Sequence, residues 1–286
     1  MSDNLAPLFS GLRTLRQPQV LGLSGPDAVA FAQAQFANDV ASLADGHWQW
    51  NAWLTAKGRV LAVFQLLRMD PEHLLLVCHD GGAEAMAEQL RRFVFRRKLN
   101  LAPAGTLAVE AAFDAPTLAR GAALARLEDG AIELDVGSAA RPRMLRLAEA
   151  GNAPYEEMAE LAWRQSDLRF GLPRLDDSQR EQWTAQQLGL DRLSAYSVKK
   201  GCYPGQEIVA RTHFLGKAKR SLVLLHTAIA STAGDAVTQA GTSVGTVASS
   251  AGRLALAVLP LELADGVLEI GSGEAQRLDL LDGLAR

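Results

Sequence analysis

The sequence predicts an α+β protein whose chain ends in a small all-β unit. In the first part of the chain, segments of alternating strand character are interspersed with segments of helical spacing. From Lys217 onward, short apolar segments are separated by glycine and serine, a pattern typical of a small β-barrel. We therefore expect an α+β region at residues 1–216 and a β-barrel at residues 217–286.

The first expected helix follows "LSGP". Ser24 can cap it, Pro26 suits its first turn, and Asp27 would meet the positive end of the helix dipole.

Periodicity and turn signals predict the remaining elements of the first region. Three strands are expected over residues 47–81, with turns at "TAKGR" and "MDPEH", and a helix is expected from Ala83 to Arg97. Three further strands are expected, with a short helix between the first two of them, at residues 106–113, 131–136 and 143–149. Helical spacing returns over residues 155–191, interrupted by "FGLPRLDD".

Composition narrows the functional class. The net charge of −3 argues against a nucleic-acid coat protein or a membrane-surface protein. The first residues lack the pattern of a secretion signal, and the longest apolar run, residues 254–261, is too short to cross a bilayer. Two cysteines, Cys78 and Cys202, do not make a disulfide framework. We expect a cytoplasmic protein.

Two apparent sites can be set aside. "GTSVG" matches the nucleophile-elbow pattern, but Ser243 lies among strand-like segments and no helix pattern follows it. The five histidines lack the spacing of metal ligands, so no metal site is predicted.

A basic segment, "LRRFVFRRKL", lies at residues 90–99. It combines two phenylalanines with five cationic residues, namely Arg91, Arg92, Arg96, Arg97 and Lys98. The simpler interpretation is a solvated helix face with Phe93 and Phe95 turned inward. The alternative is an anion site for phosphate, polyglutamate or RNA. The near-neutral net charge favours the first, and the second stays open.

The segment "YSVKKGCYPGQEIVAR" carries the main candidate for chemistry. Pro204 suits the first turn of a helix, which would place Cys202 just before the positive helix end, near Lys199 and Lys200. Such surroundings can lower a thiol pKa from about 8.5 to roughly 3.5–7.5. A buried cysteine beside a structural turn explains the residues equally well.

"KGCYPGQE" resembles the K-G-C-Y-x-G-Q-E signature of the YgfZ family of folate-binding proteins, relatives of the glycine-cleavage T-protein (aminomethyltransferase). The resemblance extends over nearly the whole chain through "GPDAVAFAQAQFANDVASL", "LTAKGRVLAVFQLL", "LRRFVFRRKLNLAP", "WRQSDLRFGLP" and "GTSVGTVASS". It implies a GcvT-like cloverleaf of α+β subdomains around a central hole that holds a tetrahydrofolate, with a C-terminal β-barrel. It also implies a role in the assembly or repair of iron–sulfur enzymes, and through them in thio-modification of tRNA.

The resemblance also implies a set of site residues. Cys202 would be the functional thiol, with Lys200 stabilising negative charge on it and Glu207 and Gln206 holding the loop. Trp163 would stack on the pterin. The remaining expected folate contacts are Asn38, Asp39, Arg169, Tyr203, Gly205 and Gln206, and Arg169 occupies the place of a glutamate in relatives. The expected partners are iron–sulfur enzymes or cluster carriers, with no direct nucleic acid and no membrane.

One departure from the T-protein bears on activity. Its catalytic aspartate would fall in "GRVLAVF", where Ala62 and Val63 offer no carboxylate. Loss of a positioned acid or base costs on the order of 10²–10⁴ in rate, which argues against aminomethyl transfer. Two alternatives stay open: a one-carbon transferase with Asp39 or Glu207 as base, and an RNA- or partner-binding module acting through the basic segment.

Overall fold

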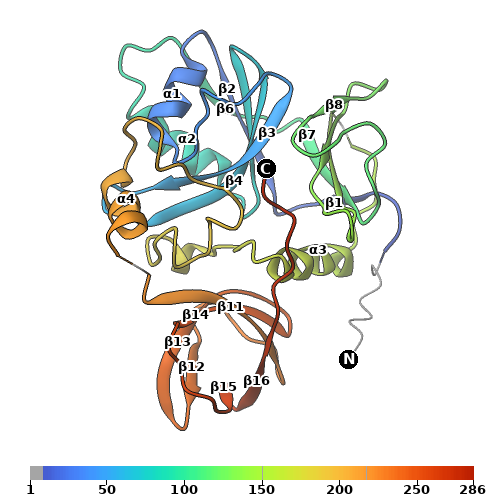
Figure 1. The fold of residues 1–286 in the computed structure, drawn as a ribbon. Helices are drawn as coiled ribbons and strands as arrows, with labels where there is room; N and C mark the ends of the chain where they lie inside the picture. The colour runs from blue at the N-terminus through green and yellow to red at the C-terminus, as the bar shows by residue number, and fades with distance from the viewer. Residues whose placement is uncertain (1–8, 150, 217) are drawn as a thin grey trace.

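The computed structural model describes residues 9–149, 151–216 and 218–286. These residues form two five-stranded sheets and a closed six-stranded barrel, connected by helices and long loops (Figure 1). The predicted α+β class with a terminal barrel is confirmed. None of the helices in these ranges is long and apolar enough to cross a membrane.

The first sheet is antiparallel and has the order β3-β4-β5-β2-β6. Its strands are β2 (Gln19–Ser24), β3 (His47–Leu54), β4 (Val60–Asp70), β5 (His73–Cys78) and β6 (Asn100–Pro103). Helices α1 (Ala28–Gln35) and α2 (Ala83–Arg91) cover one face of this sheet, because alternate strand residues such as Phe64 share a buried cluster with Phe31 of α1 and Leu90 of α2. The opposite face carries Trp48 and Trp50 and belongs to a second cluster.

The second sheet shares this second cluster. Its order is β1-β7-β10-β9-β8, formed by β1 (Arg13–Leu15), β7 (Leu107–Ala112), β8 (Ala125–Arg126), β9 (Ile132–Asp135) and β10 (Met144–Glu149). Helix α3 (Glu157–Arg169) contacts β1 of this sheet and strands of the barrel, and so lies between the two bodies (Figure 1). A short 3-10 helix, η1 (Asp177–Gln179), follows.

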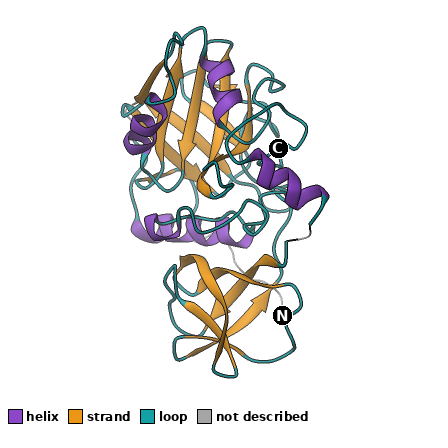
Figure 2. Ribbon diagram, turned by 90° about the vertical axis from the view of Figure 1, so that its left-hand side faces the viewer, coloured by secondary structure: helices purple, strands orange, loops and turns teal. Residues whose placement is uncertain are grey.

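Helix α4 (Gln206–Phe214) leads into the barrel. The barrel strands are β11 (Arg220–Thr227), β12 (Ala236–Gln239), β13 (Thr242–Ala251), β14 (Leu254–Pro260), β15 (Leu268–Ile270) and β16 (Gly273–Leu278). Figure 2 shows the barrel as a separate body beneath the sheets. After β16, residues 279–286 turn back from the barrel and end between the two sheets (Figure 1).

Four local predictions are wrong. The helical pattern expected after "FGLPRLDD" gives only η1 and turns up to residue 191. Ser24 is the last residue of β2 and no cap, because α1 begins at Ala28 with Asp27 as its N-cap residue. Helix α2 ends at Arg91, and a turn replaces its expected last part. Between β7 and β9 the chain forms turns and the short strand β8 instead of a helix. In each case contacts with distant parts of the chain override the local pattern.

Candidate functional site

Cys202 lies in the loop of residues 197–205, which leads into helix α4. Its side chain is exposed and its thiol is free. The helix begins at Gln206, after a left-handed Gly205, so Cys202 precedes the helix by a short turn as expected. Cys78 is the opposite case. It is the buried last residue of β5, and burial raises the pKa of its thiol to about 12. Of the two cysteines, Cys202 is therefore the one that solvent and partners can reach.

Lys200 anchors this loop to the end of α1. Its ammonium donates hydrogen bonds to the carbonyl oxygens of Gln33 (2.6 Å), Phe36 (2.6 Å) and Asn38 (2.9 Å). Burial lowers the pKa of Lys200 to about 8, against the opposing effect of Asp39. Three acceptors match the three N–H donors of an ammonium group, so the side chain has none left for Cys202. Lys200 therefore holds the loop in place, a different role from the expected stabilisation of a thiolate.

Two further predicted residues close the loop from within. The Tyr203 hydroxyl donates a hydrogen bond to the carbonyl oxygen of Ser197 (3.1 Å), and the Gln206 amide donates one to that of Lys200 (3.0 Å). Tyr203 is buried, whereas Glu207 is exposed in the first turn of α4. These bonds fix the backbone on both sides of Cys202.

Gly205 brings α4 against the turn between β3 and β4. A Cβ atom on Gly205 would lie 2.6 Å from the carbonyl oxygen of Thr55 and 2.7 Å from Cα of Gly58. Both glycines have positive φ values, +81° and +69°, which favour glycine. Gly205 therefore allows the backbone of α4 to pack closely against the backbone of this turn.

Asn38 and Asp39 lie on the same side of the molecule as Lys200. The Asn38 amide donates hydrogen bonds to the carbonyl oxygens of Trp50 (2.8 Å) and Ser194 (2.7 Å), which connects the first sheet to the segment before Cys202. The Asp39 carboxylate accepts a hydrogen bond from Gln33 Nε2 (3.0 Å). Asn38, Asp39 and Lys200, which the sequence analysis named as site residues, therefore lie together beside the Cys202 loop in the structure.

Trp163 belongs to a different place, the buried junction of the two sheets and α3. Its ring packs against the guanidinium of Arg143, 4.0 Å from the ring centroid, and against Phe113. Arg143 in turn forms a buried ion pair with Asp167, one turn further along α3. The indole is 1% exposed.

The ion pair extends into a network. Asp167 also accepts a hydrogen bond from Arg174 (2.7 Å), which reaches Asp80 (2.7 Å) through its Nε. Burial opposes ionisation of Asp167, but the charges of Arg143 and Arg174 hold its pKa below the ordinary value. The network therefore fixes the position of the Arg143 guanidinium beside Trp163.

Several buried polar atoms around this network have no hydrogen-bond partner among the described residues. They are Nε1 of Trp163, Nε and Nη1 of Arg143, both ring nitrogens of His79, and both amide atoms of Gln65. Gln65 is paired directly with Trp50 across β3 and β4, and the His79 ring lies 5.6 Å from that of Trp50, so these groups face one region. Burial, assisted by the charge of Arg174, lowers the pKa of His79 to about 3, so the imidazole is neutral. Buried polar groups are normally hydrogen-bonded, and a cluster of exceptions indicates a place where a polar ligand can bind.

Residues 279–286 cover this region. The indole N–H of Trp50 donates a hydrogen bond to the carbonyl oxygen of Leu284 (2.7 Å), and the Leu284 side chain is buried in the shared core. Arg286 donates to the carbonyl oxygen of Gly137 (2.7 Å), just after β9 of the second sheet. Arg169, at the end of α3, accepts a hydrogen bond through its carbonyl oxygen from the N–H of Leu281 (2.8 Å) and so adjoins the same segment.

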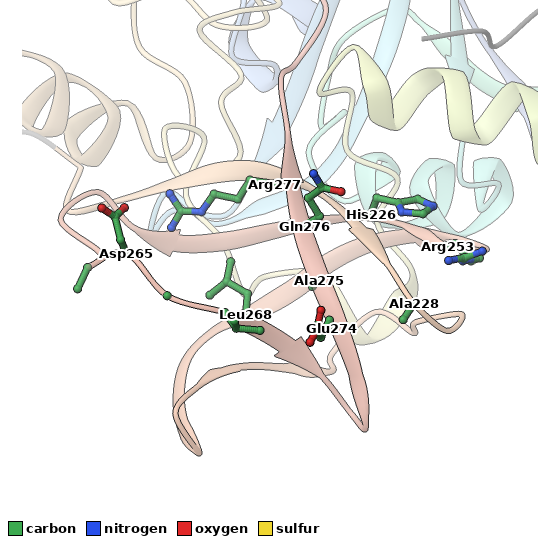
Figure 3. Close-up of a pocket in the computed structure, with 12 residues that line it drawn as sticks. His226, Ala228, Arg253, Asp265, Leu268, Glu274, Ala275, Gln276 and Arg277 are labelled. Atoms are coloured by element: carbon green, nitrogen blue, oxygen red, sulfur yellow. The ribbon is translucent and has the colours of Figure 1, made fainter. Parts of the chain in front are cut away.

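A separate cavity lies on the barrel and contains none of the predicted site residues. It is lined by His226, Arg253, Asp265, Glu274 and Arg277 (Figure 3). Burial and the charge of Arg253 lower the pKa of His226. The charges of the lining residues have both signs, so the cavity favours no one class of ligand.

Sequence reasoning missed Gln65, His79, Arg143 and Arg174. For Gln65 a signal existed, since it is a polar residue in the middle of the apolar run of β4, from Val60 to Leu67. Arg143 and Arg174 lie outside the helices and strands, and although Arg174 directly follows "WRQSDLRFGLP", its meeting with Arg143 at Asp167 depends on tertiary structure.

The chain was also compared with known proteins. No family model matches it. It is 28% identical to the tRNA-modifying protein YgfZ of Edwardsiella ictaluri over 223 residues, 72% of this chain and 67% of that protein. It is 24% identical to the tRNA-modifying protein YgfZ of Aliivibrio fischeri over 286 residues, 91% of this chain and 88% of that protein.

A solved structure gives the fold. The glycine cleavage system aminomethyltransferase T from Bartonella henselae superimposes with a TM-score of 0.73 at 17% sequence identity, covering 94% of this chain and 85% of that one. The similarity to the YgfZ family that the signature residues indicate is therefore confirmed, on the fold of the glycine-cleavage aminomethyltransferase.

Proposed function

We propose that this protein binds a tetrahydrofolate between its two sheets and uses the exposed thiol of Cys202 to support the assembly or repair of iron–sulfur enzymes. Thio-modification of tRNA would depend on it through those enzymes. The curated relatives are named as tRNA-modifying proteins, and the fold is that of a glycine-cleavage aminomethyltransferase. Both findings support the proposal.

The observation that carries the folate part is the cluster of unpartnered buried polar atoms around Trp163. A pterin has a rim of N–H donors and of nitrogen and oxygen acceptors, and it is this rim that the cluster matches, because the Arg143 guanidinium already lies over the Trp163 ring. Trp163 and Arg143 can donate hydrogen bonds, while Gln65 and neutral His79 can each donate and accept. The residues present therefore fit a pterin. When bound, tetrahydrofolate would supply one-carbon or redox chemistry.

The residues of the chain would bind and orient this ligand. Arg143, held by Asp167, would present its free N–H groups at a fixed position. Entry of the ligand would require residues 279–286 to move, because the carbonyl oxygen of Leu284 accepts the hydrogen bond of the Trp50 indole N–H. Arg169, which adjoins this segment, would then lie at the edge of the site rather than against the pterin rim.

The Cys202 part of the proposal depends on exposure and rigidity. The thiol stands on a loop whose backbone is fixed by Lys200, Tyr203 and Gln206, so a partner can approach it without rearranging the loop. A cluster, a persulfide or a partner thiol would meet Cys202 there. Asn38, Asp39, Gly205 and Glu207 would support this loop and its surroundings.

Replacing each cysteine by alanine tests this part. Cys202→Ala should lower the activity of iron–sulfur enzymes in cells that depend on this protein, because the exposed thiol is lost. Cys78→Ala is the matched control, since its buried thiol cannot reach a partner. Full support of those enzymes by the Cys202→Ala protein would contradict the proposed use of the thiol.

The rival aminomethyl transfer gains no support from the geometry. Ala62 and Val63 lie on β4 where the T-protein aspartate is expected, and neither can move a proton. Asp39 is bound to Gln33, and Glu207 is exposed on α4. Turnover of an aminomethyl donor with tetrahydrofolate would revive this alternative.

A further inference from the structure

The segment after α2, residues 92–98, forms an exposed turn that the proposed function does not use. We name it the Phe95 turn. The sequence predicts a helix face with both phenylalanines inward, but the chain leaves the helix at Arg91. Phe93 is 43% exposed and Phe95 is 86% exposed. Two large apolar rings therefore stand in solvent on a segment that also carries cationic residues.

The turn holds this conformation through its own backbone. Phe95 has a φ of +48°, a left-handed value that is uncommon for a bulky residue and costs energy. The N–H groups of Phe93 and Arg97 donate to the carbonyl oxygens of Leu90 (2.9 Å) and Val94 (3.0 Å), and the N–H of Lys98 donates to the Asp27 carboxylate (2.6 Å). The outward position of Phe95 is thus part of an ordered turn.

The charges around the rings are only partly neutralised. Arg91 pairs with Glu84, and Arg97 lies over the ring of Phe31. Among the described residues, the side chains of Arg92, Arg96 and Lys98 have no hydrogen bond or ion pair with the protein. Free cations next to exposed rings are the combination that single-stranded nucleic acids bind, because bases stack on the rings and phosphates meet the cations.

We propose that the Phe95 turn is a docking site for single-stranded RNA, such as an unpaired loop. An unstacked base would lie on Phe95, and Arg92, Arg96 and Lys98 would contact the phosphates. A membrane surface fits less well, because two rings interleaved with arginines offer little continuous apolar area for insertion. This inference departs from the expectation of no direct nucleic acid, which rested on net charge and not on local exposure.

The position of the turn relates it to the Cys202 loop. Lys98 and Asp27 meet at the beginning of α1, and Lys200 binds the carbonyl oxygens at its end. Helix α1 has 8 residues, so its two ends lie about 12 Å apart. RNA docked at the turn would therefore pass within reach of partners bound at Cys202.

Fluorescence anisotropy with a labelled RNA stem-loop tests the proposal on the full chain. Phe95→Ala should raise the Kd at least about fivefold, the lower range for loss of one stacked base. Arg92→Gln combined with Arg96→Gln should reduce the slope of log Kd against log salt by about 0.7 for each lost phosphate contact. Leu118→Ala, in the loop after β7, and Arg126→Gln, on β8, are matched controls, one an exposed apolar residue and one an exposed cation.

Circular dichroism on each variant separates loss of binding from loss of fold, and the substituted side chains are exposed, so the fold should persist. Equal RNA affinity of the wild type, Phe95→Ala and Leu118→Ala would overturn the proposal. So would binding to vesicles of anionic lipid that Phe95→Ala abolishes, if the stem-loop does not bind. Tetrahydrofolate affinity should stay unchanged in Phe95→Ala, which keeps this test independent of the folate site.

Discussion

Gly205 and Gly58 pack backbone against backbone. A Cβ atom on Gly205 would lie 2.7 Å from Cα of Gly58, a distance that real side chains do not tolerate. This contact joins the start of α4 to the turn between β3 and β4, two segments far apart in the sequence. The position of the Cys202 loop against the first sheet therefore depends on two residues without side chains.

Gly205→Ala should destabilise the protein by more than about 1–2 kcal/mol, because alanine at positive φ already costs that much and the clash with Gly58 adds to it. Chemical denaturation measures the loss. Gly201→Ala is the control in the same loop, since a Cβ there meets nothing within 4 Å. Equal stability of the two variants would show that the close packing is unimportant.

Lys200→Met should cost about 1.5–3 kcal/mol, because the substitution leaves the carbonyl oxygens of Phe36 and its neighbours without their charged donor. It should also raise the rate at which Cys202 reacts with a thiol reagent, since the loop loses its anchor. Lys199→Met, at an exposed position, should stay within about 0.5 kcal/mol of the wild type. An unchanged reaction rate in Lys200→Met would contradict the anchoring role.

Asp167→Asn should destabilise the protein by about 3–5 kcal/mol, the usual cost of removing one partner of a buried ion pair. The reason is that Arg143 and Arg174 would remain buried with their charges uncompensated. Asp129→Asn is the contrasting control, because its pair with Arg146 is solvent-exposed and should contribute at most about 1 kcal/mol. Similar losses in the two variants would argue against the network.

Acid should destabilise the protein through His79. Its pKa is lowered to about 3 in the folded state, so between that value and the ordinary 6.5 the unfolded chain binds one proton more. Stability therefore falls as the pH drops through this window, by roughly 1–2 kcal/mol between pH 6.5 and pH 5 for this residue. His79→Gln should remove that part of the loss, measured by denaturation at both pH values. An identical pH dependence in the variant would rule out a buried neutral His79.

The sequence predicts the α+β class, the barrel and most strands, because these follow from periodicity within short segments. It fails where distant residues decide. Ser24 has the pattern of a cap but continues β2 in pairing with His73, and the helix expected to reach Arg97 ends at Arg91, before a turn whose Lys98 N–H donates to the Asp27 carboxylate. Local propensity contains neither contact.

In the candidate site too, the sequence predicts what depends on a local motif and misses what depends on contacts between distant residues. The signature identifies the Cys202 loop, and Asn38 and Asp39 do lie on its side of the molecule. Lys200, two residues from the thiol in sequence, turns its ammonium to the end of α1. Of the polar cluster around Trp163, the sequence offered a signal only for Trp163 and Gln65, because His79 and Arg143 meet them only in the folded chain.

A tetrahydrofolate titration of the wild type and Gln65→Leu tests the central claim most directly. Leucine fills a similar volume without the two unpartnered amide atoms, so the variant should be at least as stable as the wild type. If those atoms bind the pterin, Gln65→Leu should raise the Kd by roughly fivefold to 150-fold, equivalent to about 1–3 kcal/mol. Intrinsic tryptophan fluorescence can follow binding, with Trp163→Phe to identify the reporting ring and Trp53→Phe, on the other face of the sheet, as its control. Saturable binding that weakens in Gln65→Leu and Trp163→Phe is the predicted result, and equal affinity in all proteins, or no binding to any of them, would contradict a folate site between the two sheets.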